Sequence, residues 1–250
     1  DLSEIFGAKY VSAVSSGTAA LHLAGLALGW KKEDIILTSP ITFLASANCI
    51  IYSGATPDLV DINLQTYTID TEKLEEKVLF YRKKGTNIKA VIAVDYAGHP
   101  CDWKELRNLA NKYDFQLVND NCHAIKSEYN HDSKYAARYA DIVTQSFHPV
   151  KHITTGEGGA VITNNKKYHK KVKELRTHGI SYNIKKNGES IGPWYREMVD
   201  LGYNYRLTDI QSALGSSQLI SLDGKINKRQ ELALKYNNSL SQNDLYITPK

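Results

Sequence analysis

Apolar runs and helical stretches alternate along most of the chain. The run from Ile88 to Asp95 is hydrophobic almost throughout, and a second such run extends from Phe115 to Asp120. Strands that are apolar on both faces are typical of parallel sheets covered by helices on each side. Helix-like segments at 71–84 and 102–113 lie beside these runs. The alternation over residues 9–178 therefore predicts an α/β fold with three layers, αβα, in which helices cover both faces of a mainly parallel sheet.

The remaining elements follow from the same pattern. Further strands are expected at 9–15, 34–40, 55–61, 141–145, 160–163 and 244–250, and further helices at 2–7, 18–28, 42–53, 165–178, 208–219 and 222–240. Residues 181–198 are polar and rich in Gly and Pro, so we expect a long loop there. No internal repeat or clear linker divides the chain.

Lys151 lies in a turn between two of these strands. The segment 146–160 reads SFHPVKHITTGEGGA, so a proline and several glycines constrain the backbone around the lysine. A desolvated lysine amine held in this way can attack an aldehyde and form a Schiff base. Most lysines are solvated charges, however, and the local frame alone favours that reading.

Two other positions suit a planar, phosphorylated ligand. Ser16, Gly17 and Thr18 open an Ala- and Leu-rich helix, and the free amides at such a helix start can bind a phosphate. An ordinary helix cap at Ser16 or Thr18 explains the same residues and is the commoner case. Phe43, at the start of the next helix, is either a core aromatic or a flat surface for a ring.

A carboxylate ends one of the buried strands. Asp120 closes the strand at 115–120, and the carboxyl edge of such a sheet is where ligands bind. A capping or turn role for Asp120 and a partly buried, satisfied His123 are the commoner alternatives. Together, a phosphate seat, a strand-end anion and a framed lysine meet the three needs of pyridoxal phosphate, which are a phosphate site, a partner for the ring nitrogen and an amine for the aldehyde.

Composition limits the other classes of protein. The 250 residues are 42% hydrophobic and 23% charged, ordinary values for a globular protein, and the net charge of +4 is too mild and dispersed to indicate nucleic-acid binding. No apolar run approaches the roughly 20 residues of a membrane span, and the first residues do not resemble a signal peptide. Three cysteines without a CxxC pair indicate the reducing cytoplasm. Neither HExxH, GxGxxG nor a P-loop is present, so no metal site or nucleotide fingerprint is expected.

Four segments in chain order resemble the DegT/DnrJ/EryC1/StrS family of sugar aminotransferases, namely 16–21, 120–124, 146–159 and 202–209. The resemblance covers essentially all 250 residues and implies the large domain of a fold-type I pyridoxal-phosphate transferase. The large domain would occupy residues 1–220, and a small C-terminal domain would begin at 221–250. Family members normally continue beyond both ends of this sequence, so we expect a chain shortened at both termini. The run at 146–159 is most similar to the branch that aminates UDP-linked 4-keto-6-deoxy sugars in the pseudaminic-acid pathway.

The resemblance also implies roles for individual residues. These are the Schiff base for Lys151, pairing with the ring nitrogen for Asp120, stacking on the ring for Phe43, a position near the phenolic oxygen for His123, and phosphate contacts for Gly17, Thr18 and Ser146. Asn204 would reach the phosphate bound by a partner subunit, so the active site would be shared in a homodimer. Residues 119–123, Asn-Asp-Asn-Cys-His, depart from the family's usual Glu-Asp-Ala-Ala-His but keep the Asp and the His. A lysine at 151, where dehydratase members have histidine, argues against that branch.

We therefore expect an enzyme in which Lys151, Asp120 and His123 are catalytic. It would move an amino group from an amino acid, by resemblance glutamate, to a nucleotide-linked 4-keto-6-deoxy sugar. A non-catalytic relative that binds sugar nucleotides or acts in regulation is the alternative. A nicotinamide-dependent oxidoreductase has no fingerprint motif to support it.

Overall fold

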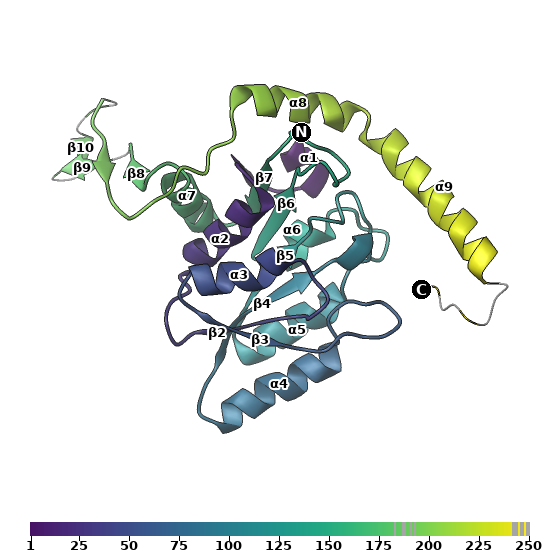
Figure 1. The fold of residues 1–250 in the computed structure, drawn as a ribbon. Helices are drawn as coiled ribbons and strands as arrows, with labels where there is room; N and C mark the ends of the chain where they lie inside the picture. The colour runs from purple at the N-terminus through teal and green to yellow at the C-terminus, as the bar shows by residue number, and fades with distance from the viewer. Residues whose placement is uncertain are drawn as a thin grey trace.

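A seven-stranded sheet forms the centre of the molecule, with strand order β1-β7-β6-β5-β4-β2-β3 (Figure 1). The computed structural model describes residues 1–250 except 183, 187–188, 191, 193, 242–244, 246–247 and 249–250. The strands of this sheet are β1 (Tyr10–Val14), β2 (Ile35–Thr38), β3 (Thr56–Leu59), β4 (Ile88–Val94), β5 (Gln116–Asp120), β6 (Ile142–Ser146) and β7 (Gly159–Thr163).

The sheet is parallel except at β7. Neighbouring strands from β3 through β2, β4 and β5 to β6 pair in parallel, whereas β7 pairs antiparallel with both β6 and β1. The carboxyl ends of all strands other than β7 therefore meet at one edge of the sheet. The expected mainly parallel sheet is confirmed.

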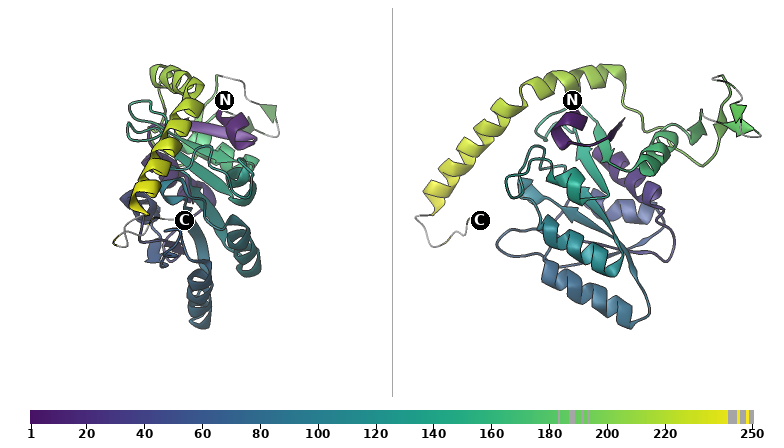
Figure 2. Two further views of the ribbon diagram at one scale, coloured as in Figure 1. Left: turned by 90° about the vertical axis from the view of Figure 1, so that its right-hand side faces the viewer. Right: turned by 180° about the vertical axis from the view of Figure 1, so that it is seen from behind.

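Helices cover both faces of the sheet (Figures 1 and 2). One face packs against α2 (Gly17–Leu28), α3 (Leu44–Tyr52) and α7 (Lys166–Leu175). The other packs against α1 (Leu2–Phe6), α4 (Thr71–Lys83), α5 (Trp103–Tyr113) and α6 (Tyr135–Tyr139). The three-layer αβα architecture predicted from the alternating pattern is confirmed.

The strand sequences explain why the sheet needs both layers. In β5, Leu117 and Val118 are both completely buried, yet they belong to the two different cores on either side of the sheet. Val91 and Ile92 of β4 divide in the same way. Burying each such side chain contributes about 1.5–3 kcal/mol, so a sheet exposed on one face would lose much of its stability.

Two helices leave this body near the end of the chain. The helix α8 (Asp209–Ile220) begins at Thr208, whose hydroxyl caps the amide of Gln211, and α9 (Leu222–Leu240) follows after Ser221. Leu222 is fully buried, but most side chains further along α9 are exposed. The two helices form an arch along the outside of the layers (Figures 1 and 2). Within the described part of the chain, no helix is long and apolar enough to cross a membrane.

The structure differs from the sequence expectation in some local segments and leaves one expected strand untested. The polar segment at 181–198 is not a plain loop, because β8 (Ile180–Ser181) pairs with β11 (Glu197–Met198) and β9 (Lys185–Lys186) pairs with β10 (Glu189–Ser190). The short helix α6 and the 3-10 turn η1 (Tyr96–Gly98) were not expected. The strand expected at 244–250 falls mostly outside the described residues.

Candidate active site

One cavity at the carboxyl edge of the sheet collects nearly all of the expected site residues. It has a volume of about 380 Å³ and lies where β5 and β6 end beside the start of α2. Its lining includes Gly17, Thr18, Phe43, Asp120, His123, Ser146 and Lys151. Asn204 is the expected site residue that does not line it. Residues far apart in sequence thus meet because parallel strands end at a common edge.

Asp120 is the last residue of β5 and is only 5% exposed. The Ser46 hydroxyl donates a hydrogen bond of 2.7 Å to its Oδ2, and the Cys122 amide donates one of 3.3 Å to its Oδ1. Both oxygens are therefore oriented by the protein. An ionised carboxylate accepts further hydrogen bonds, so Asp120 can also accept one from a cationic N–H in the cavity.

Ser46 is a site residue that the sequence did not reveal. It is fully buried in α3, and its hydroxyl also contacts the Thr42 hydroxyl at 2.8 Å. Thr42 itself lines the cavity. Thr42 precedes α3, which begins at Leu44, so the contact depends on how the chain enters the helix. Cys122 also lines the cavity, and burial, together with the nearby Asp120 charge, raises the pKa of its thiol, so the thiol remains neutral.

The loop that carries Lys151 is closed at its base. The Phe147 amide donates to the Gly158 carbonyl at 2.8 Å, and the Lys151 amide donates to the His148 carbonyl at 2.9 Å. A Cβ on Gly159 would lie only 2.5 Å from the Ser16 carbonyl oxygen, so the base of this loop admits no side chain. The constrained frame around Lys151 expected from the sequence is present.

The start of α2 lies directly against β6. The Ser16 hydroxyl accepts a hydrogen bond of 3.0 Å from the Ala19 amide, which makes Ser16 the helix cap. The amides of Gly17 and Thr18 lie in the first turn, where an N–H has no carbonyl partner within the helix. A Cβ on Gly17 would stand 2.7 Å from the Ser146 Cβ, so glycine brings these amides and the Ser146 hydroxyl together. The cap and the phosphate seat are compatible, because they use different groups of the same turn.

His123 is neutral and has a defined tautomer. Burial lowers its pKa, the Lys151 charge lowers it further, and the Asp120 charge opposes these effects only in part. Its Nδ1 accepts a hydrogen bond of 3.3 Å from the Ala97 amide. The proton of the neutral ring therefore resides on Nε2, which leaves an N–H donor for a ligand oxygen.

Phe43 and Asn204 are both exposed. Phe43 precedes α3 at the cavity lining and is 66% exposed, so it is not a core aromatic. Asn204 pairs with Thr177 in an isolated β-bridge, between Tyr203 and Tyr205, whose rings stack at 4.9 Å. Backbone hydrogen bonds hold Tyr203 and Tyr205 against the C-terminal end of α7. Asn204 is thus presented on a fixed segment outside this chain's own cavity.

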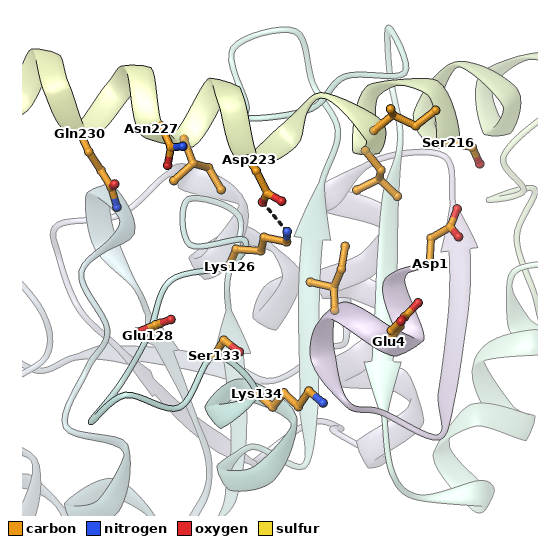
Figure 3. Close-up of a pocket in the computed structure, with 14 residues that line it drawn as sticks. Asp1, Glu4, Lys126, Glu128, Ser133, Lys134, Ser216, Asp223, Asn227 and Gln230 are labelled. Atoms are coloured by element: carbon orange, nitrogen blue, oxygen red, sulfur yellow. Dashed lines mark hydrogen bonds and ion pairs between the residues drawn. The ribbon is translucent and has the colours of Figure 1, made fainter.

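A larger cavity of about 810 Å³ lies beneath the junction of α8 and α9. Figure 3 shows its charged lining, in which Lys126 and Asp223 face one another and form an ion pair. None of the expected site residues belongs to it. This cavity is large because α9 spans across the outside of the sheet and its helices. The cavity at the sheet edge is the better candidate for the active site, because Lys151 and Asp120 line it.

The residues of the sheet-edge cavity fit pyridoxal phosphate. A half-buried lysine, a buried carboxylate and a helix start crowded against a serine occupy one space, and its volume lies within the range of ligand pockets. The neutral imidazole adds a donor for the ring oxygen. These features and the αβα fold define the class of the site, which is one suited to pyridoxal phosphate.

Comparison with known proteins gives the family. The chain belongs to the DegT/DnrJ/EryC1/StrS aminotransferase family, whose model matches residues 1–250. It is 43% identical over 249 residues to the UDP-4-amino-4,6-dideoxy-N-acetyl-beta-L-altrosamine transaminase of Campylobacter jejuni subsp. jejuni serotype O:23/36 (strain 81-176), a match that covers 100% of this chain and 62% of the relative.

Two solved structures have the same fold. Helicobacter pylori PseC, an aminotransferase involved in the biosynthesis of pseudoaminic acid, superposes with a TM-score of 0.83 at 35% identity, over 97% of this chain and 62% of that one. NtdA from Bacillus subtilis with bound cofactor PMP superposes with a TM-score of 0.81 at 32% identity, over 96% of this chain and 51% of that one. The chain spans about 62% of the length of the Campylobacter jejuni relative.

Proposed function

We propose that the whole protein is a pyridoxal-phosphate-dependent aminotransferase that moves an amino group from an amino acid, glutamate, to a nucleotide-linked 4-keto-6-deoxy sugar. The observation that carries this proposal is the single cavity at the sheet edge that contains Lys151, Asp120 and the contact between Gly17 and Ser146. The similarity to a transaminase named for a UDP-linked amino sugar supports the choice of acceptor.

The bound cofactor supplies an aldehyde and a protonated pyridine ring that withdraws electrons from the reacting carbon. Lys151 would hold the aldehyde through its amine, and the same amine, when free, would be the group that carries a proton. The amides of Gly17 and Thr18 and the Ser146 hydroxyl bind the phosphate. Phe43 covers one face of the ring.

Asp120 and His123 set the charge distribution across the ring. The carboxylate, oriented by Ser46 and the Cys122 amide, accepts the hydrogen bond of the ring N–H and keeps that nitrogen protonated. The neutral imidazole would offer its Nε2–H to the phenolic oxygen of the cofactor. The carboxylate would therefore favour a protonated, electron-withdrawing ring, and the imidazole would add a hydrogen-bond donor to it.

The active site is proposed to be shared between two subunits. Asn204 is exposed and lies outside its own cavity, so its amide can serve the phosphate site of a second copy. The helix α3 follows Phe43 of the cavity lining and carries large apolar side chains that are well exposed, among them Leu44 at 71% and Ile51 at 58%. Exposed apolar groups concentrated on one helix mark an interaction surface. These observations support a homodimer.

The chain divides into two parts under this proposal. Residues 1–220 form the large, cofactor-binding domain, and 221–250 begin the small C-terminal domain. The boundary is supported by Ser221, which separates α8 from α9, and by the loss of burial along α9 after Leu222. A cytoplasmic location is part of the same proposal, supported by the three free cysteines.

Mass spectrometry of the reaction product tests the function. The whole protein, supplied with pyridoxal phosphate, glutamate and a UDP-linked 4-keto-6-deoxy sugar, should yield the 4-amino sugar nucleotide, and ¹⁵N-labelled glutamate should transfer its label. Binding of the nucleotide sugar without any half-reaction with glutamate would instead identify a non-catalytic relative.

A further inference from the structure

A second aspartate, Asp95, is completely buried directly behind the proposed site. It follows β4 at the same sheet edge, and its own amide donates a hydrogen bond of 3.2 Å to the Asp120 carbonyl. Among the residues that the structure describes, no Lys, Arg or His lies within ion-pair distance of its carboxylate. A buried anion without a cationic partner is costly to the fold, so its retention calls for a reason.

Five donors converge on the Asp95 carboxylate. Oδ1 accepts from the Cys101 amide and from Trp103 Nε1, each at 2.9 Å. Oδ2 accepts from Asn119 Nδ2 at 3.0 Å, Asn121 Nδ2 at 2.9 Å and the Tyr135 hydroxyl at 2.6 Å. All of these neighbours donate to Asp95, which suits a carboxylate that only accepts. Burial raises the pKa of Asp95, and the hydrogen bonds oppose this and favour the carboxylate.

Two of these donors flank Asp120. Successive side chains of a strand point to opposite faces of the sheet, so Asn119 and Asn121 face Asp95 while Asp120 faces the cavity. The backbone on both sides of Asp120 is therefore fastened to one buried anion.

The network continues into β6. Gln145 Nε2 donates to the Asn121 carbonyl at 2.7 Å and also to the Asn121 side-chain oxygen. The backbone amide of Asn121 donates to the Thr144 carbonyl at 3.1 Å. Gln145 immediately precedes Ser146, which contacts the start of α2. A single set of hydrogen bonds thus connects the strand ends that carry the proposed ring-nitrogen partner and the proposed phosphate ligand.

We propose that Asp95 is a positioning residue for the cofactor site, one that holds Asp120 and Ser146 in register with each other through Asn119, Asn121 and Gln145. This inference rests on the proposed function. Groups that bind a rigid ligand at two ends must be held to within about 0.5 Å, and a buried network of hydrogen bonds provides such rigidity. Asp95 touches no substrate or cofactor and acts only through its partners.

A pair of variants separates positioning from folding stability. Asn121→Ala removes the link from Asp95 to Gln145 and β6, while Asn119 still joins Asp95 to β5. The control Trp103→Phe removes a donor to the other Asp95 oxygen and leaves Asn121 unchanged. Replacing Asp95 itself risks unfolding, so these substitutions are preferred. The measurements on the full-length protein are the dissociation constant of pyridoxal phosphate, the pH titration of bound-cofactor absorbance, and the melting temperature.

The expected result is a difference between the two variants. Both should melt at a lower temperature, but Asn121→Ala alone should weaken cofactor binding by about five- to tenfold and shift the titration midpoint. A wild-type protein that takes up no cofactor would refute the proposed function and this inference with it. Normal wild-type binding beside two variants with indistinguishable affinities and titrations would refute the inference alone.

Discussion

Replacement of Gly17 by alanine tests the proposed phosphate site with a single added methyl group. Gly17 is buried at the first position of α2, and a Cβ there would lie 2.7 Å from the Ser146 Cβ and 3.0 Å from its Oγ. Both atoms are in a side chain on the last residue of β6, where the backbone cannot yield easily. The helix start must therefore move away from β6 to accept the methyl group.

The size of the effect follows from the packing. Extra methyl groups in a well-packed interior cost about 1–3 kcal/mol. Alanine is a better helix former than glycine by up to about 1 kcal/mol, which offsets part of this cost. A net cost of roughly 1–2 kcal/mol remains. Phosphate binding requires the original spacing between the α2 amides and the Ser146 hydroxyl, so this cost reduces the free energy of cofactor binding. Cofactor binding should therefore weaken about 5- to 30-fold.

The assay is titration of the unliganded protein with pyridoxal phosphate, followed by absorbance and by quenching of tryptophan fluorescence. Gly224→Ala is the matched control, because a Cβ at Gly224 in α9 meets no atom within 4 Å. This control should bind the cofactor like the wild type. A Gly17→Ala protein with wild-type affinity would show that the start of α2 is not the phosphate site.

Three further outcomes follow from the structure. Ser46→Ala removes the 2.7 Å hydrogen bond to Asp120 and should weaken cofactor binding about tenfold or more, whereas Ser53→Ala, at the other end of α3, should leave it unchanged. Burial and, to a lesser degree, nearby cationic groups lower the pKa of His152 from 6.5 to about 4. Between these two pH values the unfolded state binds a proton that the folded state does not. The free energy of unfolding should therefore fall as the pH drops from about 6.5 to about 4. Urea denaturation should show a shallower fall for His152→Asn, and identical pH profiles would contradict this. Lys151→Ala should be colourless with pyridoxal phosphate, since it lacks the amine that binds the aldehyde.

The fold was predictable wherever the hydrophobic pattern was long and uniform. The run at 88–95 is apolar on both faces, which left a buried parallel strand as the simplest interpretation. Pairing direction was harder, because β7 has an apolar pattern like its neighbours although it runs antiparallel to β6. The five residues of α6 were missed, since so short a segment shows little helical periodicity. The two-residue strands at 180–198 depend on pairing and not on local pattern.

The site residues also differ in how far the sequence could predict them. Asp120 ends β5 and Lys151 lies in the loop that follows β6, so the pattern of strands could place both near the carboxyl edge of the sheet, whereas their roles were expected from the family resemblance. Ser46 was missed because a small hydroxyl residue inside an apolar helix is compatible with any buried surface. The hydrogen-bond partners of Asp95 lie up to 40 residues away in sequence, so only the folded chain shows that they surround one carboxylate.

The covalent bond between the cofactor and Lys151 is the claim on which the rest depends. The most direct test is to incubate the whole protein with pyridoxal phosphate, reduce it with borohydride and map the modified peptide by mass spectrometry. The added mass should lie on the peptide that contains Lys151, and the Lys151→Ala protein should carry no stable label. A label on a different lysine, or an equal label in that variant, would contradict it.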